Sequence, residues 1–286
     1  MELITYLQEK KKIINQYLVE KLPLEQENPF LIHRSIRYSV LNGGKRLRPI
    51  LTLMTAELFG KSYELVLSTA AGIELIHCFT LVHDDLPCMD DDDYRRGKLT
   101  NHKVFGEGMA VLTGDALLVM GLSFICQNAE LEGVSKKSVI LVLQNILDML
   151  GTKKMLGGQV EDINWQSQNQ NPDKIKDIYL KKTSALICAS LEAGALLSQA
   201  SKEQISALNE FGENIGLAFQ ITDDLLDLQQ DKKGYDKPTY PAIFGVDKSR
   251  DWVQQYCRLA KESMSIFGRK AELFCKLVDY VQHRKE

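Results

Sequence analysis

The sequence predicts an all-α protein, and three observations support this. Proline is absent from 88–171 and from 173–237, so both stretches can form long helices. Apolar residues recur at helical spacing, as in the stripe Val139, Leu143, Ile146, Leu147 and Leu150. No Asn-Gly hairpin and no run with a period of two residues is evident. A single domain, 1–286, of about ten helices fits this length better than two domains do.

Apolar stripes and turn residues mark the expected helices along the chain. The first carries an apolar stripe between positions 3 and 18, and the next is expected to start at Pro49, after a Gly-Gly turn. An apolar run from 73 to 82 should end at Asp84 and Asp85. The stretch 109–126 is apolar nearly all round, which indicates a buried central helix. A further helix is expected to contain QITDDLLD, positions 220–227.

Composition excludes several classes of protein. The 286 residues are 44% hydrophobic and 26% charged, and the net charge of -3 argues against nucleic-acid binding. Charge near the N-terminus argues against a signal peptide, and the apolar stretch 116–129 is too short to span a bilayer. Six cysteines without CxxC spacing suit a reduced compartment. We therefore expect a cytoplasmic protein without stable membrane insertion.

Two acidic clusters occur, at 83–98 and at 220–227, and the second is hard to explain as a solvated surface. Asp223 and Asp227 lie four residues apart, on one face of a helix, with Asp224 beside them. Three carboxylates within two turns repel one another, and a hard divalent cation such as Mg²⁺ would relieve that repulsion. The pattern favours metal binding over a solvated acidic face.

The first acidic cluster lies in HDDLPCMDDDDYRRGK, positions 83–98. Carboxylates at a helix C-terminus are unfavourable without a cation. Asp84 and Asp90 are six residues apart, which a regular helix would not place on one face. A break at Pro87 could swing Asp90 back towards Asp84. A second metal site is therefore expected here.

Two basic segments complement the acidic clusters. Arg95 and Arg96 follow the first cluster directly, and NGGKRLRP, positions 42–49, places Lys45, Arg46 and Arg48 at a Gly-Gly turn. Glycines, guanidinium groups and a helix N-terminus together suit a diphosphate, although this segment alone could be a surface loop. Metal sites and anion sites together imply substrates that carry diphosphates.

The chain resembles the trans-type prenyl diphosphate synthases, most closely bacterial-type farnesyl diphosphate synthases. Five motifs occur in the family's order: GGKRLRP, HDDLPCMDDDDYRRGKLTNH, GGQVEDI, KKTSAL and GLAFQITDDLLD. The resemblance implies helices around a central cavity, a homodimer, and two or three Mg²⁺ ions per active site. It also implies condensation of isopentenyl diphosphate with dimethylallyl and geranyl diphosphate to give farnesyl diphosphate.

The resemblance assigns a role to individual residues. The catalytic residues are Asp84, Asp90, Arg95, Lys182 and Asp223, and the metal ligands are Asp84, Asp90, Asp223, Asp224 and Asp227. The isopentenyl diphosphate site matches Gly44, Lys45, Arg48, His77 and Arg96. The allylic diphosphate site matches Arg95, Lys182, Thr183, Gln220 and Lys237. Gln159 and Asp162 match positions lining the cavity. The product-length positions are Phe79 and Thr80.

One segment departs from the family pattern. DLQQDKKGYDKPTYP, positions 227–241, is short, and Lys237 follows Asp236 where the family usually has Gly. The expected phosphate contact could instead come from Lys232 or Lys233, or be lost.

Several alternatives remain open on the sequence alone. The first acidic motif also looks like that of geranylgeranyl diphosphate synthases, so a twenty-carbon product is the nearest alternative. A class I terpene cyclase would lack GGKRLRP, and a non-catalytic subunit of a heterodimeric synthase would usually have eroded aspartate motifs. His77 could also be a satisfied core histidine.

Overall fold

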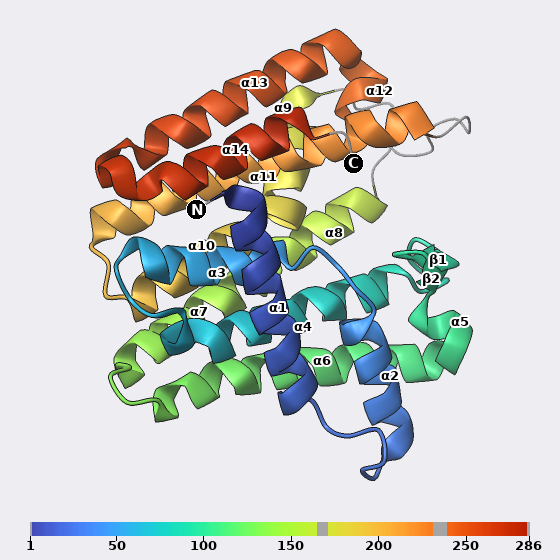
Figure 1. The fold of residues 1–286 in the computed structure, drawn as a ribbon. Helices are drawn as coiled ribbons and strands as arrows, with labels where there is room; N and C mark the ends of the chain where they lie inside the picture. Colours follow the sequence, from blue (N-terminus) through green and yellow to red (C-terminus); the bar gives the residue numbers. More distant parts are fainter. Residues whose placement is uncertain (1, 165–170, 231–238, 285–286) are drawn as a thin grey trace. The chain divides into compact units, whose positions relative to one another are not determined.

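The computed structural model describes residues 2–164, 171–230 and 239–284 (Figure 1). The all-α prediction is confirmed, because helices dominate. The described strands form one short hairpin, with two residues in each strand. Ten described helices are twelve residues or longer, in line with the expected number. The chain forms two compact units, Met1–Leu143 and Gln144–Glu286, which are described separately. The single-domain assignment stays a prediction.

The first unit contains six α-helices, the hairpin and the start of a seventh helix. Their bounds are α1 Leu3–Lys21, α2 Phe30–Leu41, α3 Leu47–Leu58, α4 Leu67–Asp84, β1 Tyr94–Arg95, β2 Lys98–Leu99, α5 Asn101–Phe105, α6 Glu107–Gln127 and α7 Lys136–Leu150. Short 3-10 turns, Tyr63–Val66 and Asn128–Glu130, join some of them.

Helix α4 forms the core of the first unit and packs along α6. Two glycines permit this close approach, because a Cβ atom on Gly72 would lie 2.5 Å from the carbonyl oxygen of Gly121. A neighbouring hydrogen bond, from Ser68 Oγ to the carbonyl of Phe124 at 2.8 Å, links the same helices. The aspartates at the end of α4 therefore extend from a rigid, buried element.

Helix α6 differs from the central buried helix that the sequence predicted. Leu112 and Val119 are 53% and 66% exposed, although the opposite face packs on α4. An apolar composition on every side predicted burial on every side, but neighbours within the described chain cover only one face. That prediction is wrong for the exposed face.

Two described helical segments, Tyr63–Asp84 and Glu107–Glu130, are long and apolar enough to cross a bilayer, judged by length and composition alone. The first has 72% of its most apolar window buried, as a core helix does, and the second 39%. Residues 116–129 lie within a 24-residue helical segment, so the prediction that this stretch is too short to span a bilayer is wrong. The absence of membrane insertion stays a prediction.

The second unit contains the rest of α7 and seven further α-helices. These are α8 Met155–Ile163, α9 Pro172–Tyr179, α10 Ala185–Leu197, α11 Lys202–Gln230, α12 Tyr240–Phe244, α13 Val246–Ser263 and α14 Glu272–His283. A five-residue π turn, η3 Leu180–Ser184, joins α9 to α10, and η4 Met264–Ala271 precedes α14. Helices α13 and α14 run beside the long α11 (Figure 1). Helix α11 is thus supported along its length.

All six cysteines are free thiols, and the reduced compartment stays a prediction. Cys188 is buried, whereas Cys126 is exposed on α6.

Candidate active site

The first aspartate cluster begins where α4 ends. Asp84 is the last residue of this helix, and the backbone N–H of Asp90 donates to the carbonyl of Asp84 at 2.9 Å. The intervening chain turns back on itself through two bonds to the Leu86 carbonyl, from Met89 and Asp91. The expectation that the chain breaks near Pro87 and returns Asp90 to Asp84 is confirmed. Two carboxylate-bearing residues therefore meet at one helix end.

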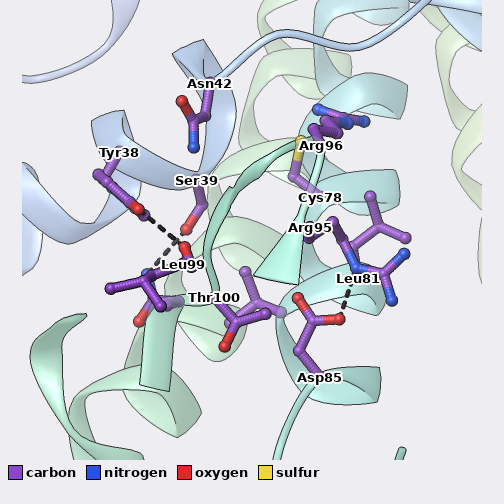
Figure 2. A pocket seen from close by; sticks show the side chains of 12 residues that line it. Tyr38, Ser39, Asn42, Cys78, Leu81, Asp85, Arg95, Arg96, Leu99 and Thr100 are labelled. Carbon is purple, nitrogen blue, oxygen red and sulfur yellow. Dashed lines mark hydrogen bonds and ion pairs between the residues drawn. The ribbon is translucent and has the colours of Figure 1, made fainter. Parts of the chain in front are cut away.

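Asp85 is the buried member of this cluster. It is 4% exposed, and Arg95 Nε donates to its Oδ1 atom at 2.5 Å (Figure 2). Burial raises the pKa of Asp85 to about 6, against the opposing effect of the Arg95 charge. A second Arg95 nitrogen donates to Asp92 at 2.9 Å. Asp85 and Asp92 thus fix the side chain of Arg95.

A two-residue hairpin loop separates the roles of the adjacent arginines. Arg96 and Gly97 both have positive φ, 54° and 76°, as the tight turn between β1 and β2 requires. An arginine in this region is strained by about 1–2 kcal/mol. Figure 2 shows the side chains pointing apart, with Arg95 toward Asp85 and Arg96 away from it. Sequence patterning did not reveal this hairpin, for which Gly97 was the available signal.

The Gly-Gly turn holds the guanidinium of Arg96. Gly43 and Gly44 have φ of 90° and 112°, and Arg96 Nη1 donates to the carbonyl of Gly43 at 2.7 Å. A Cβ atom on Gly44 would lie 2.6 Å from Arg96 Cζ. The missing side chain of Gly44 is therefore what lets Arg96 reach the turn.

The basic residues after this turn have different functions. Arg46 is 3% exposed, pairs with buried Glu74 at 2.6 Å, and donates to Asn15 and to the Val40 carbonyl. It is therefore a structural anchor, not an anion ligand as the sequence pattern suggested. Lys45, next to it, is exposed.

Helix α3 starts earlier than the sequence predicted. Its first residue is Leu47, so Pro49 is the third helical residue rather than the first. The missing N–H of Pro49 still falls in the first turn, where it has no intrahelical acceptor to lose. Arg48 therefore lies within the first turn of α3, two residues after the anchored Arg46.

Arg48 and His77 lie together, as expected for one site. Arg48 Nη1 is 3.2 Å from His77 Nε2. Burial lowers the pKa of His77 well below its ordinary value, and the charges of Arg48, Arg96, Arg46 and Arg95 lower it further. His77 is thus neutral near pH 7 and accepts a hydrogen bond from Arg48. Several guanidinium groups around a neutral imidazole make this region suitable for an anion.

Figure 2 shows a small pocket of the first unit, lined in part by Arg95 and Arg96. Its volume is about 40 Å³, and its lining includes Tyr38, Cys78, Asp85, Arg95 and Arg96. That volume accommodates water but not a prenyl substrate. The cavity is therefore not the substrate pocket itself.

The second aspartate cluster lies on α11. Asp227 is exposed and Asp223 half-buried, whereas Asp224 is 6% exposed. Asp224 accepts hydrogen bonds from the Tyr179 hydroxyl at 2.5 Å and from Gln220 Nε2 at 3.1 Å. Burial raises the pKa of Asp224 to about 6, against the effect of these two bonds. This geometry favours a supporting role for Asp224.

The π turn η3 presents Lys182 and Thr183. Lys182 Nζ pairs with Asp162 at 2.6 Å, and Thr183 Oγ1 donates to Gln220 Oε1 at 3.0 Å. π turns inside helical segments are frequent at functional sites.

Two glycines allow neighbouring helices to approach this turn. A Cβ atom on Gly158 would lie 2.7 Å from Lys181 Cβ, and one on Gly216 would lie 2.3 Å from Ser184 Oγ. Three of the residues assigned to the allylic site, Lys182, Thr183 and Gln220, are therefore clustered in the second unit.

The comparisons with known proteins agree with this arrangement. Residues 29–248 match the model of the polyprenyl synthetase family. The chain belongs to that family. It is 38% identical to a geranylgeranyl diphosphate synthase of Cyanophora paradoxa, over 99% of this chain and 96% of the relative. It is 36% identical to a farnesyl diphosphate synthase of Bacillus subtilis (strain 168), over 99% and 98%.

A solved structure is also similar. The FPP/GFPP synthase from Zymomonas mobilis, in its apo form, has a TM-score of 0.90 and 33% identity, with 98% of each chain covered. The chain is accordingly a prenyltransferase of this family, and the resemblance inferred from its motifs is confirmed.

The carboxylates of the enzyme fit Mg²⁺ in their chemistry. Among residues 2–164, 171–230 and 239–284, no three carboxylate, imidazole or thiol groups converge as a ready-made metal cage. Mg²⁺ seldom uses such a cage, since it usually takes one or two carboxylates and completes its shell with water and phosphate. Two pairs of carboxylates suit this type of coordination: Asp84 with Asp90, and Asp223 with Asp227 on one helix.

Three contacts to the predicted site residues were not predicted from the sequence. Asp85 holds Arg95, Tyr179 holds Asp224, and Arg284 pairs with Asp223 at 2.5 Å. Only Asp85 had a local signal, as the second aspartate of the first motif. Lys237, Lys232 and Lys233 lie outside the described residues, so their assignment stays a prediction.

Proposed function

We propose that the enzyme is a Mg²⁺-dependent farnesyl diphosphate synthase that condenses isopentenyl diphosphate with dimethylallyl and geranyl diphosphate. The single observation that carries the farnesyl assignment is the position of Phe79. This side chain is 9% exposed and lies on α4, five residues before Asp84. Five residues correspond to about 7.5 Å along a helix, more than one turn below the aspartates.

The first unit is proposed to bind isopentenyl diphosphate. Arg48 and Arg96 would contact the diphosphate through charge-assisted hydrogen bonds. His77, held neutral, orients Arg48 by accepting its N–H. Gly44 keeps space for the Arg96 guanidinium, and Lys45 lies exposed at the same turn.

The second unit is proposed to contribute the allylic diphosphate ligands Lys182, Thr183 and Gln220. Lys182 is already paired with Asp162, so binding a diphosphate exchanges a carboxylate partner for a phosphate partner. Thr183 and Gln220 hold each other in place through their hydrogen bond. Asp223 and Asp227 would be the metal ligands here, as Asp84 and Asp90 would be in the first unit.

The reaction proceeds by ionisation, condensation and elimination. The allylic C–O bond breaks and its electron pair leaves with diphosphate. The isopentenyl double bond then attacks the allylic cation, and the released diphosphate accepts the proton whose loss gives the new double bond. Bound Mg²⁺ would stabilise the negative charge that develops on the leaving diphosphate. Lys182 would add positive charge toward that anion. No covalent nucleophile on the protein is needed.

Phe79 is proposed to form the floor of the tunnel that receives the growing chain, with Thr80 beside it. The Phe79 ring packs edge-on against His83, with ring centroids 5.1 Å apart. Replacing Phe79 with alanine removes this ring, and each additional buried methylene gains ~0.8 kcal/mol. We expect the Phe79→Ala variant to release geranylgeranyl diphosphate beside farnesyl diphosphate.

The test is product analysis by chromatography after incubation with Mg²⁺, isopentenyl diphosphate and dimethylallyl diphosphate. EDTA-treated enzyme serves as the metal-free control and should be inactive. Phe→Ala in a core costs ~3–5 kcal/mol, so thermal unfolding must show that the variant is folded. A folded variant that stops cleanly at fifteen carbons would assign the product length to another residue.

A geranylgeranyl diphosphate synthase is the second candidate. The specific observation in its favour is that similar relatives, from Catharanthus roseus and Cyanophora paradoxa, bear that name. The wild-type product in the same assay distinguishes the two, because a twenty-carbon main product would replace the farnesyl assignment.

A homodimer in the cytoplasm is proposed as the working state. The exposed apolar face of α6, including Leu112 and Val119, supports a second copy as its partner, since an isologous interface would bury both faces.

A further inference from the structure

Arg284 is a buried arginine that contacts the second aspartate cluster. It follows α14 directly, and its Nη2 donates to Asp223 Oδ1 at 2.5 Å and to the Phe219 carbonyl at 2.9 Å. Its guanidinium carbon lies 4.0 Å from the centroid of the Phe219 ring. The Arg284 side chain is 2% exposed, whereas that of Asp223 is 38% exposed.

These surroundings fix the arginine in place. A guanidinium does not lose its proton in a protein, so burying it requires a negative partner. Asp223 supplies that charge, while the ring and carbonyl of Phe219 occupy one face and one N–H of the group. Swinging Arg284 away would leave a buried charge unpaired. The cation therefore remains beside Asp223 when a metal approaches.

The other two aspartates of the cluster, Asp224 and Asp227, have different surroundings. Asp224 is buried and accepts from Tyr179 and Gln220, which are both neutral donors. Asp227 is exposed on the same helix. Among the described residues, Arg284 is a cation that pairs with a carboxylate of this cluster, and it lies 61 residues further along the chain.

We propose that Arg284 is the built-in counter-ion of the second aspartate cluster, which lowers the affinity of Asp223 for bare Mg²⁺ so that tight metal binding requires a diphosphate. The inference rests on the proposed function of Asp223 as a metal ligand. A fixed positive charge beside a ligand oxygen repels an incoming dication. A diphosphate that arrives with the metal offsets that repulsion through its own negative charge. Arg284 is in this sense a positioning residue, which acts through Asp223.

The test measures metal affinity directly, with Mn²⁺ as a paramagnetic probe followed by electron paramagnetic resonance. Without other ligands, Arg284→Met should bind Mn²⁺ roughly tenfold more tightly than wild type, because one repelling charge is gone. With inorganic pyrophosphate present, the gain should shrink. Arg284→Lys keeps the charge and should resemble wild type. Arg258→Met, which removes an exposed ion pair to Glu262 on α13, is the matched control and should change nothing.

A purely structural arginine would give a different pattern. Losing an anchor lowers the unfolding temperature but does not tighten metal binding, so circular dichroism and thermal unfolding accompany each titration. The increase in affinity should also disappear in an Asp223→Asn background, which places the effect at that carboxylate.

The outcomes separate this inference from the proposed function. Mn²⁺ binding by wild type with equal or weaker binding by folded Arg284→Met overturns the counter-ion role alone. A gain that persists in Asp223→Asn also overturns it. Absence of Mn²⁺ binding by both proteins, with and without pyrophosphate, overturns the metal centre and the counter-ion role together.

Discussion

Replacing Gly44 with alanine tests how the Gly-Gly turn positions Arg96. The new Cβ would lie 2.6–2.7 Å from three atoms of the Arg96 guanidinium, inside van der Waals contact. These atoms end a flexible side chain, so Arg96 should move while the backbone stays. Arg96 would then lose its 2.7 Å bond to the Gly43 carbonyl and its approach to an anion at this turn.

The substitution should have two separate effects, one on stability and one on affinity for isopentenyl diphosphate. Alanine at φ of 112° is strained on the order of 1–3 kcal/mol, which lowers stability. A misplaced charged hydrogen bond to a phosphate costs ~1.5–3 kcal/mol of affinity, a roughly 10- to 100-fold rise in KM for isopentenyl diphosphate. The KM for geranyl diphosphate should change much less, because its proposed ligands include Lys182 and Gln220 in the second unit.

Gly43→Ala is the matched control. Gly43 also has positive φ, 90°, but a Cβ atom there meets nothing within 4 Å. Both variants should therefore lose similar stability in thermal unfolding, and only Gly44→Ala should show the large rise in KM. The KM for isopentenyl diphosphate should be no higher in the Gly44→Ala, Arg96→Ala double variant than in Arg96→Ala alone. An equal KM rise in both glycine variants would refute the idea that Gly44 makes room for Arg96.

Two further predictions concern the charged groups around the diphosphates. Arg48→Ala should mainly raise the KM for isopentenyl diphosphate and Lys182→Ala that for the allylic substrate, measured by steady-state kinetics, and equal effects of both changes on both substrates would contradict the assignment. The depressed pKa of His77 means that the folded state resists protonation. His77 therefore contributes stability that is complete above pH 6.5 and is lost as pH falls below it. Urea unfolding at pH 7 and 5.5 should show a smaller loss of stability for His77→Gln than for wild type, and identical losses would argue against a buried neutral His77.

Much of the candidate site follows from local sequence. The helical class, the end of α4 at Asp84 and the return of Asp90 depend on helix periodicity and on a chain break near Pro87, which act over a few residues. The proximity of Asp223 and Asp227 likewise needs only helical spacing. These features could be predicted because neighbouring residues alone impose them.

Burial and long-range pairing decided the rest. Arg46 and Arg48 lie two residues apart in one basic segment, yet Arg46 is anchored by Glu74 and Asn15, whereas Arg48 lies beside His77. Charge and spacing alone do not distinguish them, because their difference depends on which helices pack around each. Arg284 meets Asp223 from 61 residues away for the same reason: the packing of α14 against α11 brings it there. Local sequence thus determined the carboxylates and cations available to this enzyme, and tertiary packing determined which of them are paired with each other.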